Sequence, residues 1–150
     1  MKRAGVVLIL VLAFFGIADS AYLAQHETTG LPLLCNIESL TGCNVVVSSA
    51  YSQFLGVPLA DLGLIFYTVL FVVAAFEIAL FNQSLRRGLQ VLAVIGIVTS
   101  LYSVYTQVFL INALCIYCLV SASITILVLV LASFIEPLRK NPLQNNLATT

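Results

Sequence analysis

Residues 114–135 read LCIYCLVSASITILVLVLASFI, an uncharged apolar run that opens on a Cys-x-x-Cys motif. A helix needs about 20 apolar residues to cross the hydrocarbon core of a bilayer, and this run is that long. Inside lipid the backbone must satisfy its own polar groups, which a helix does within a single segment. The run therefore predicts a transmembrane helix that carries two cysteines near one end.

Three further runs of this kind cover residues 4–24, 59–81 and 88–110. The whole chain is 61% hydrophobic and only 8% charged, whereas soluble domains carry about 25% charged residues. The sequence thus predicts an all-α integral membrane protein: one domain over residues 1–150 built as a four-transmembrane-helix bundle. The net charge is zero and no basic run suggests a nucleic-acid partner, so none is expected.

The basic residues predict the orientation of this bundle. They fall in three pairs, all on the same side of a four-span chain: Lys2-Arg3, Arg86-Arg87 and Arg139-Lys140. The positive-inside rule makes that side cytoplasmic. We therefore expect a multi-pass protein of the cytoplasmic membrane with both termini inside. The alternative, a signal peptide over residues 1–24, is disfavoured because its apolar stretch is long for such a peptide.

The opposite, outer side then receives a polar loop over residues 25–57 and all four cysteines. A short helix over residues 44–55 is expected to lie at the membrane surface and to cap the bundle. Asp19 and Glu77 lie near opposite ends of their spans. We expect both carboxylates to be close enough to the membrane surface to be hydrated.

The cysteines form two pairs, Cys35 with Cys43 in the loop and Cys115 with Cys118 at the last span. The spacing of three residues places Cys115 and Cys118 on one helical face. With Asn112 as the expected N-cap, Cys115 falls in the first helical turn, where the helix dipole favours a thiolate. Two dithiols on one side of a membrane indicate a relay that exchanges disulfides.

Two other uses of four cysteines remain open from the residues alone. Both pairs could be static disulfides that staple the outer side, since an oxidising compartment favours such bonds. A tetrahedral zinc site is the other alternative, but the separation of Cys35 and Cys43 exceeds the usual spacing of two to four residues. We expect no metal site.

The order of the cysteines resembles the vitamin K epoxide reductase family in its single-domain bacterial form. The resemblance covers roughly residues 5–135. Its further matches are GIADSAYL at residues 16–23, CNVVVSSAY at residues 43–51, GVP at residues 56–58, Ser100 with Tyr102, and Gln107.

This resemblance implies four spans around a quinone, either ubiquinone or menaquinone. By position, Cys35 exchanges with a secreted or periplasmic thioredoxin-like (DsbA-like) partner, and Cys43 exchanges with Cys115. Cys118 then faces the quinone, and Ser49 occupies the place of the family serine beside it. Asp61 and Tyr67 are the polar candidates on the second span.

Two departures bear on the substrate. Ala122 stands where vertebrate members have a tyrosine associated with vitamin K, and the outer half of the second span has no asparagine. Quinone reduction coupled to disulfide formation is therefore expected, with vitamin K epoxide reduction as the alternative. The DsbB family also has four spans and two outer pairs, but it places its Cys-x-x-Cys first in the chain.

Overall fold

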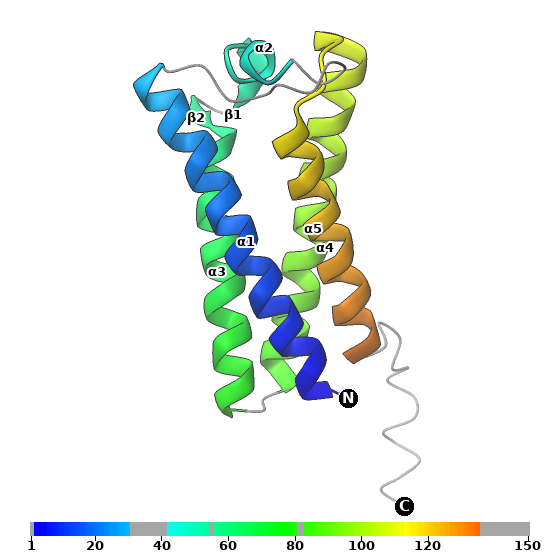
Figure 1. The fold of residues 1–150 in the computed structure, drawn as a ribbon. Helices are drawn as coiled ribbons and strands as arrows, with labels where there is room; N and C mark the ends of the chain where they lie inside the picture. The colour runs from blue at the N-terminus through cyan, green and yellow to red at the C-terminus, as the bar shows by residue number, and fades with distance from the viewer. Residues whose placement is uncertain (1, 31–41, 55, 81–82, 136–150) are drawn as a thin grey trace, which may run out of the picture.

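The computed structural model describes residues 2–30, 42–54, 56–80 and 83–135. Its four long helices stand side by side as a bundle, as the sequence predicts (Figure 1). They are α1 (Lys2–Thr29), α3 (Leu59–Leu80), α4 (Gln83–Tyr105), which continues as the π-helix η2 (Thr106–Ile111), and α5 (Ile116–Ile135). Each is long and apolar enough to cross a membrane. The protein is therefore an all-α membrane protein.

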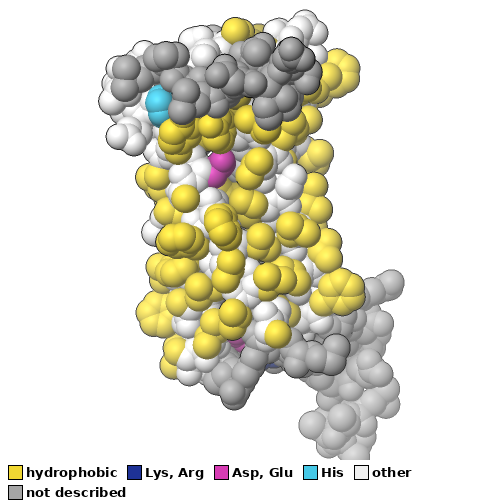
Figure 2. Space-filling view, in the orientation of Figure 1, with side chains coloured by type: hydrophobic (Ala, Val, Ile, Leu, Met, Phe, Trp, Pro, Cys, Tyr) yellow, Lys and Arg dark blue, Asp and Glu magenta, His cyan; other side chains and the backbone are white. Residues whose placement is uncertain are grey.

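Hydrophobic side chains cover the side of the bundle that Figure 2 shows, between its two ends. Large apolar residues are exposed on every long helix, among them Phe15, Ile65, Val98 and Phe134. In water such a surface would drive association, whereas lipid tails would solvate it. The exposed apolar surface thus agrees with a bundle immersed in a bilayer.

The helix ends differ from the predicted bounds. Helix α1 continues past Ala24 to Thr29, and the hydroxyls of Thr28 and Thr29 donate hydrogen bonds to the carbonyl of Gln25 within the last turn. Gly30 then ends the helix with φ of 66°. Helix α4 begins at Gln83 rather than at Gly88, so Arg86 lies within the helix.

The expected helix over residues 44–55 is wrong in extent. Helix α2 (Cys43–Val47) makes little more than one turn and is followed by the 3₁₀ turn η1 (Ala50–Ser52). A hairpin of β1 (Gln53–Phe54) and β2 (Val57–Pro58) then leads into α3. Three consecutive valines are poor helix formers, and the hydroxyl of Ser48 donates back to the Asn44 carbonyl at 2.7 Å. These short elements lie across the top of the bundle in Figure 1.

We call the end of the bundle that carries α2 the cysteine end, and the opposite end the N-terminal end. The bundle core lies mainly between the middle of the helices and the N-terminal end. Its twelve buried residues are Val6, Ile9, Ala13, Tyr67, Leu70, Ala74, Leu89, Ala93, Ile124, Val128, Ala132 and Ile135. All four long helices contribute to this cluster, so it fixes their relative positions.

An ion pair joins α3 to α4 at the N-terminal end. Arg86 Nε donates to Glu77 Oε1 at 2.6 Å, and Glu77 is only 2% exposed. The expectation of a hydrated Glu77 is therefore wrong, because α4 begins earlier than predicted and brings Arg86 over the carboxylate. The paired charge has a structural role between these two helices.

Candidate functional site

A cluster of buried residues at the cysteine end holds one cysteine from each predicted pair. Cys43 on α2 and Cys115 before α5 are both fully buried, and they pack in one cluster with Leu23 and Val46. Gly42 makes this approach possible, since a Cβ there would lie 2.7 Å from the Ala113 Cβ. The chain thus brings a loop cysteine and a helix cysteine into the same packed site.

The turn that carries Cys115 is organised by Gln107. The Cys115 backbone N–H donates to Gln107 Oε1 at 3.0 Å, and the Ala113 N–H donates to the Gln107 carbonyl at 3.1 Å. Gln107 Nε2 in turn donates to Ser103 Oγ at 3.1 Å. Gln107 is 1% exposed, so these bonds are shielded from water. The π-helix η2 buries this side chain beneath the turn.

Asn112 has a different role from the one predicted. It ends η2 in the left-handed region, with φ of 52°, and is therefore a C-cap. The Cys115 carbonyl accepts the N–H of Leu119 at 3.2 Å, and α5 begins at Ile116. Cys115 is thus itself the N-cap of α5, and its sulfur still lies at the positive end of the helix dipole.

The thiol groups differ in state and in acidity. Cys115 and Cys118 are free thiols, whereas Cys43 is in a disulfide. A hydrogen bond from the Cys118 side chain lowers the pKa of Cys115 to about 7, against the opposing effect of burial. Cys115 is therefore the better nucleophile of a dithiol pair near neutral pH. Cys35, the fourth predicted relay residue, lies outside the described residues.

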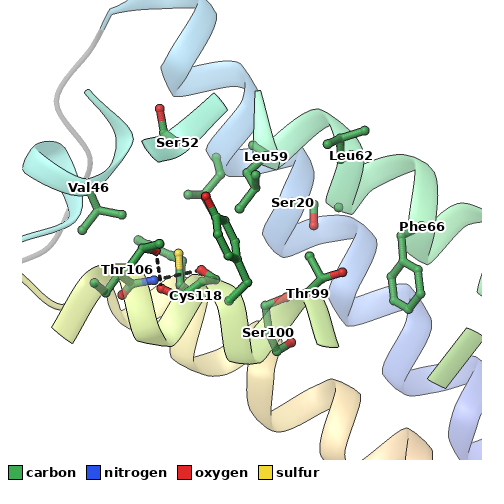
Figure 3. A pocket seen from close by; sticks show the side chains of 18 of the residues that line it. Ser20, Val46, Ser52, Leu59, Leu62, Phe66, Thr99, Ser100, Thr106 and Cys118 are labelled. Carbon is green, nitrogen blue, oxygen red and sulfur yellow. Dashed lines mark hydrogen bonds between the residues drawn. The ribbon is translucent and has the colours of Figure 1, made fainter. Parts of the chain in front are cut away.

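A cavity of about 630 Å³ lies beneath these cysteines, between the four long helices. Cys118 lines it and Cys115 does not. Figure 3 shows Ser20 of α1 and Phe66 of α3 on one side of Cys118, with Thr99 and Ser100 of α4 nearby. The lining is mostly apolar and carries a few polar groups, which is the usual composition of a small-molecule site.

Three other predicted site residues have distinct positions. Tyr67 lines the cavity, but its hydroxyl is bonded to Ser121 on α5, 3.0 Å from the carbonyl and 2.7 Å from Oγ. Ser49 caps η1, donates to the Val46 carbonyl at 2.7 Å, and is not among the residues that line the cavity. Asp61, in the first turn of α3, is not among them either.

Asp19 is the residue that the sequence interpretation placed wrongly. It lines the cavity, and its Oδ2 atom is buried with no hydrogen-bond partner in the part of the chain that the structure describes. The prediction of a hydrated carboxylate assumed a position near the membrane surface. That assumption failed because α1 continues to Thr29, which places Asp19 deeper in the bundle than a helix ending at Ala24 would.

The cavity is suited to a lipid-soluble quinone in three respects. It lies between membrane-spanning helices, and its walls are largely apolar. A cysteine thiol that can give up electrons opens on it. The Asp19 Oδ2 atom offers a polar contact that no described residue satisfies.

Comparison with known protein families agrees with this geometry. The model of the vitamin K epoxide reductase family matches residues 7–133. The match includes all four long helices, apart from the first residues of α1 and the last two of α5, and every cysteine. The protein therefore belongs to the vitamin K epoxide reductase family.

Proposed function

We propose that the protein is a quinone-dependent thiol oxidoreductase that generates disulfides for a secreted or periplasmic thioredoxin-like (DsbA-like) partner. Its family consists of oxidoreductases that act with quinones or vitamin K. One observation carries the proposal: Cys43 and Cys115 are buried in one cluster, while Cys118 opens on the cavity. The two pairs are thus connected to each other on one side and to an apolar site on the other.

The relay begins at the loop pair. Partner thiols reduce the loop disulfide through Cys35, which leaves a Cys43 thiolate. Cys43 attacks the Cys115 sulfur of the oxidised helix pair, forms a Cys43–Cys115 disulfide and releases Cys118. Cys35 then attacks Cys43, and the helix pair is left reduced. Burial of Cys43 beside Cys115 keeps water and other thiols away from this exchange.

The reduced helix pair returns its electrons to the membrane. Bound in the cavity, ubiquinone or menaquinone would supply a two-electron acceptor that matches the oxidation of one dithiol. Cys118 is the thiol in contact with this site, and Cys115 closes the disulfide behind it. Free thiols at Cys115 and Cys118, with Cys43 in a disulfide, correspond to the state that precedes this transfer.

We further propose that the cysteine end faces the outside of the cytoplasmic membrane. Arg86 and Arg87 lie in α4, whose first residues and the start of α1 are at the N-terminal end (Figure 1). These positions agree with a cytoplasmic location of that end under the positive-inside rule. Both chain termini are then cytoplasmic, and the relay faces an oxidising compartment in which disulfides persist.

A cross-linking experiment tests the relay directly. The double variant Cys35→Ser/Cys118→Ser keeps only Cys43 and Cys115, and mild oxidation should link these two sulfurs rapidly. The matched control, Cys43→Ser/Cys115→Ser, keeps only Cys35 and Cys118 and should give little link. Equal yields in the two proteins would overturn the proposed route. Static staples instead predict that single cysteine variants retain full quinone-dependent oxidation of the partner.

A further inference from the structure

Asp19 carries a carboxyl oxygen inside the proposed quinone site that has no hydrogen-bond partner among the described residues. Its Oδ2 atom is buried and unbonded, and the residue lines the same cavity as Cys118. Buried polar groups in proteins are almost always hydrogen-bonded, so an unpartnered one in a cavity points to a ligand or to chemistry. An ionised carboxylate without a partner is also costly in an apolar site, which favours its neutral acid form there.

Other titratable groups around the cavity do not satisfy this oxygen. They are Glu27 on α1, Tyr51 on η1, Tyr67 on α3, Tyr102 on α4, and Tyr117 and Cys118 on α5. Tyr67, the buried tyrosine, is bonded to Ser121 instead. Asp19 therefore remains the carboxyl group that is free to meet a ligand deep in the cavity.

Glu27 lies on the same stripe of α1 as Asp19. Asp19, Leu23 and Glu27 are spaced four residues apart, and all three line the cavity. At about 1.5 Å per residue, Glu27 is about 12 Å nearer the cysteine end of the helix. Glu27 is half-buried and lies in the last turn of α1, so water can reach it. The stripe therefore places one acid at the outer end of the cavity wall and the other deeper along it.

We propose that Asp19 is the proton donor to the bound quinone and that Glu27 resupplies its proton. This inference rests on the proposed quinone-reducing function. Reduction of a quinone to a quinol consumes two electrons and two protons. Both electrons come from the Cys115 thiolate and the Cys118 thiol as their disulfide forms. One proton comes from the Cys118 thiol and the other from the Asp19 carboxylic acid, which is left as a carboxylate.

The second proton needs a source because the proposed relay releases Cys115 as a thiolate. Cys115 leaves its disulfide with Cys43 as a thiolate when Cys35 attacks Cys43, so the dithiol alone is one proton short. Asp19 provides the missing proton inside the cavity, and Glu27 returns one from outside. A positioned acid of this kind typically accelerates proton transfer by about 10²–10⁴-fold.

Two substitutions test this role in the full-length protein. Asp19→Asn keeps the size of the side chain but removes the acid, and Asp19→Glu restores it. The matched control is Thr68→Val, which removes a polar group from the exposed side of α3, where the hydroxyl bonds only within its own helix. Dithiothreitol as donor and a short-chain ubiquinone as acceptor give the rate of quinol formation.

We expect Asp19→Asn to slow quinol formation about 100-fold, with Asp19→Glu recovering much of it and Thr68→Val leaving it unchanged. A second readout needs no quinone: infrared spectra of the isolated protein should show the C=O band of a protonated carboxylic acid, which Asp19→Asn removes. Exchange between Cys43 and Cys115 should proceed normally in every variant.

The results separate this inference from the proposed function. Wild-type rates in Asp19→Asn, or an infrared band that the substitution does not change, would overturn the role of Asp19 and leave the relay intact. Failure of the wild-type protein to reduce quinone would overturn the proposed function itself.

Discussion

The two halves of the bundle are built from the same four helices, but one half has a filled interior and the other surrounds a cavity. Toward the N-terminal end, apolar residues of α1, α3, α4 and α5 fill the interior, and an ion pair links two of the helices. Toward the cysteine end, the helices surround a cavity of about 630 Å³ with polar groups and thiols on its wall. The first half can supply most of the stability, which allows the second to keep space for a ligand and an unsatisfied carboxylate.

Gly16 lies at the boundary between the filled half and the cavity half of the bundle. Gly16 on α1 lies against the ring of Tyr67, and a Cβ at Gly16 would overlap that ring. This contact brings α1 against α3 at the depth where the core meets the cavity. Below it the helices pack on each other, and above it they bound the cavity. Substitutions in the two halves should therefore affect different measurements.

The largest effect is expected from Cys115→Ser at the cysteine end. A hydroxyl of the same shape cannot form the disulfide that releases electrons, so quinol formation should fall to background. The thermal midpoint of unfolding should change little, since serine fits the same site. Ser133→Ala, near the N-terminal end, is the control, because that hydroxyl bonds only within α5. Measurable turnover in Cys115→Ser would show that the electrons take another route.

Glu77→Ala should have the opposite effect: it should lower stability and leave the rate of quinol formation unchanged. It leaves the Arg86 guanidinium, 19% exposed, without its buried partner. Breaking a fully buried pair costs about 3–5 kcal/mol, and partial exposure of Arg86 reduces this to about 2–3 kcal/mol. Denaturant unfolding in detergent measures the loss, while the rate of quinol formation by folded protein should not change.

A second variant checks the cause of that loss. The double substitution Glu77→Leu/Arg86→Leu removes both charges and should recover most of the lost stability, because no unpaired charge remains. If the double variant is no more stable than Glu77→Ala, the loss comes from the missing attraction between the two charges rather than from a buried lone charge.

The sequence predicts the core half of the fold well, since hydropathy alone locates four spans. It predicts the cysteine end less well, because that end depends on hydrogen bonds that hydropathy does not report. Residues 25–29 are polar, yet they continue α1, and the Thr28 and Thr29 hydroxyls bond to the carbonyl of Gln25 within its last turn. The error at the end of α1 then misplaced Asp19, whose side chain is found in the cavity rather than at the surface.

The candidate site shows the same limit. The cysteine spacing indicates redox chemistry, but it does not reveal that Gln107 holds the turn, since that contact needs a side chain reaching eight residues along the chain. The expected helix over residues 44–55 ends early for a similar reason, because the hydroxyls of Ser48 and Ser49 bond back to the backbone. Ser52, rather than Ser49, is the serine of that segment that lines the cavity.

A smaller effect is expected on the pH dependence of thiol exchange. The lowered pKa of Cys115, about 7 instead of 9.0, arises first from the Cys118 hydrogen bond. In the reverse of the proposed exchange, attack of the Cys115 thiolate on the loop disulfide should therefore rise with pH through about 7 and fall about tenfold per pH unit below it. Labelling the thiol released at Cys35 with a maleimide measures the rate.

Two variants at Cys118 separate the hydrogen bond from other causes. Cys118→Ser keeps a donor to the Cys115 sulfur. The pH at which exchange reaches half of its maximal rate should therefore stay near 7 in this variant. Cys118→Ala removes the donor, so its half-point should move up toward 9.0 and its rate at pH 7 should be about tenfold lower. Coincident pH profiles for the two variants would assign the low pKa to the helix dipole instead.

The smallest effect is expected from a pair of glycine substitutions, one in each half. A Cβ at Gly42 would lie 2.7 Å from the Ala113 Cβ and 3.0 Å from the Leu114 backbone, so Gly42→Ala must displace Cys43 from the Cys115 turn. A Cβ at Gly88 would meet only Val73, at 3.9 Å, which is ordinary contact. Gly42 has φ of −77°, which alanine also adopts, so the effect of Gly42→Ala is steric.

Gly42→Ala should slow Cys43–Cys115 exchange by about threefold to tenfold, since an ångström of misplacement at reacting atoms costs up to about 10²-fold. Gly88→Ala should leave exchange unchanged and raise stability by about 0.5–1 kcal/mol, because alanine favours a helix interior over glycine. Quenched alkylation measures exchange, and denaturant unfolding measures stability. Equal exchange rates in the two variants would mean that the loop cysteine reaches Cys115 by a motion that Gly42 does not control, and the packed cluster would then be a resting arrangement rather than the reactive one.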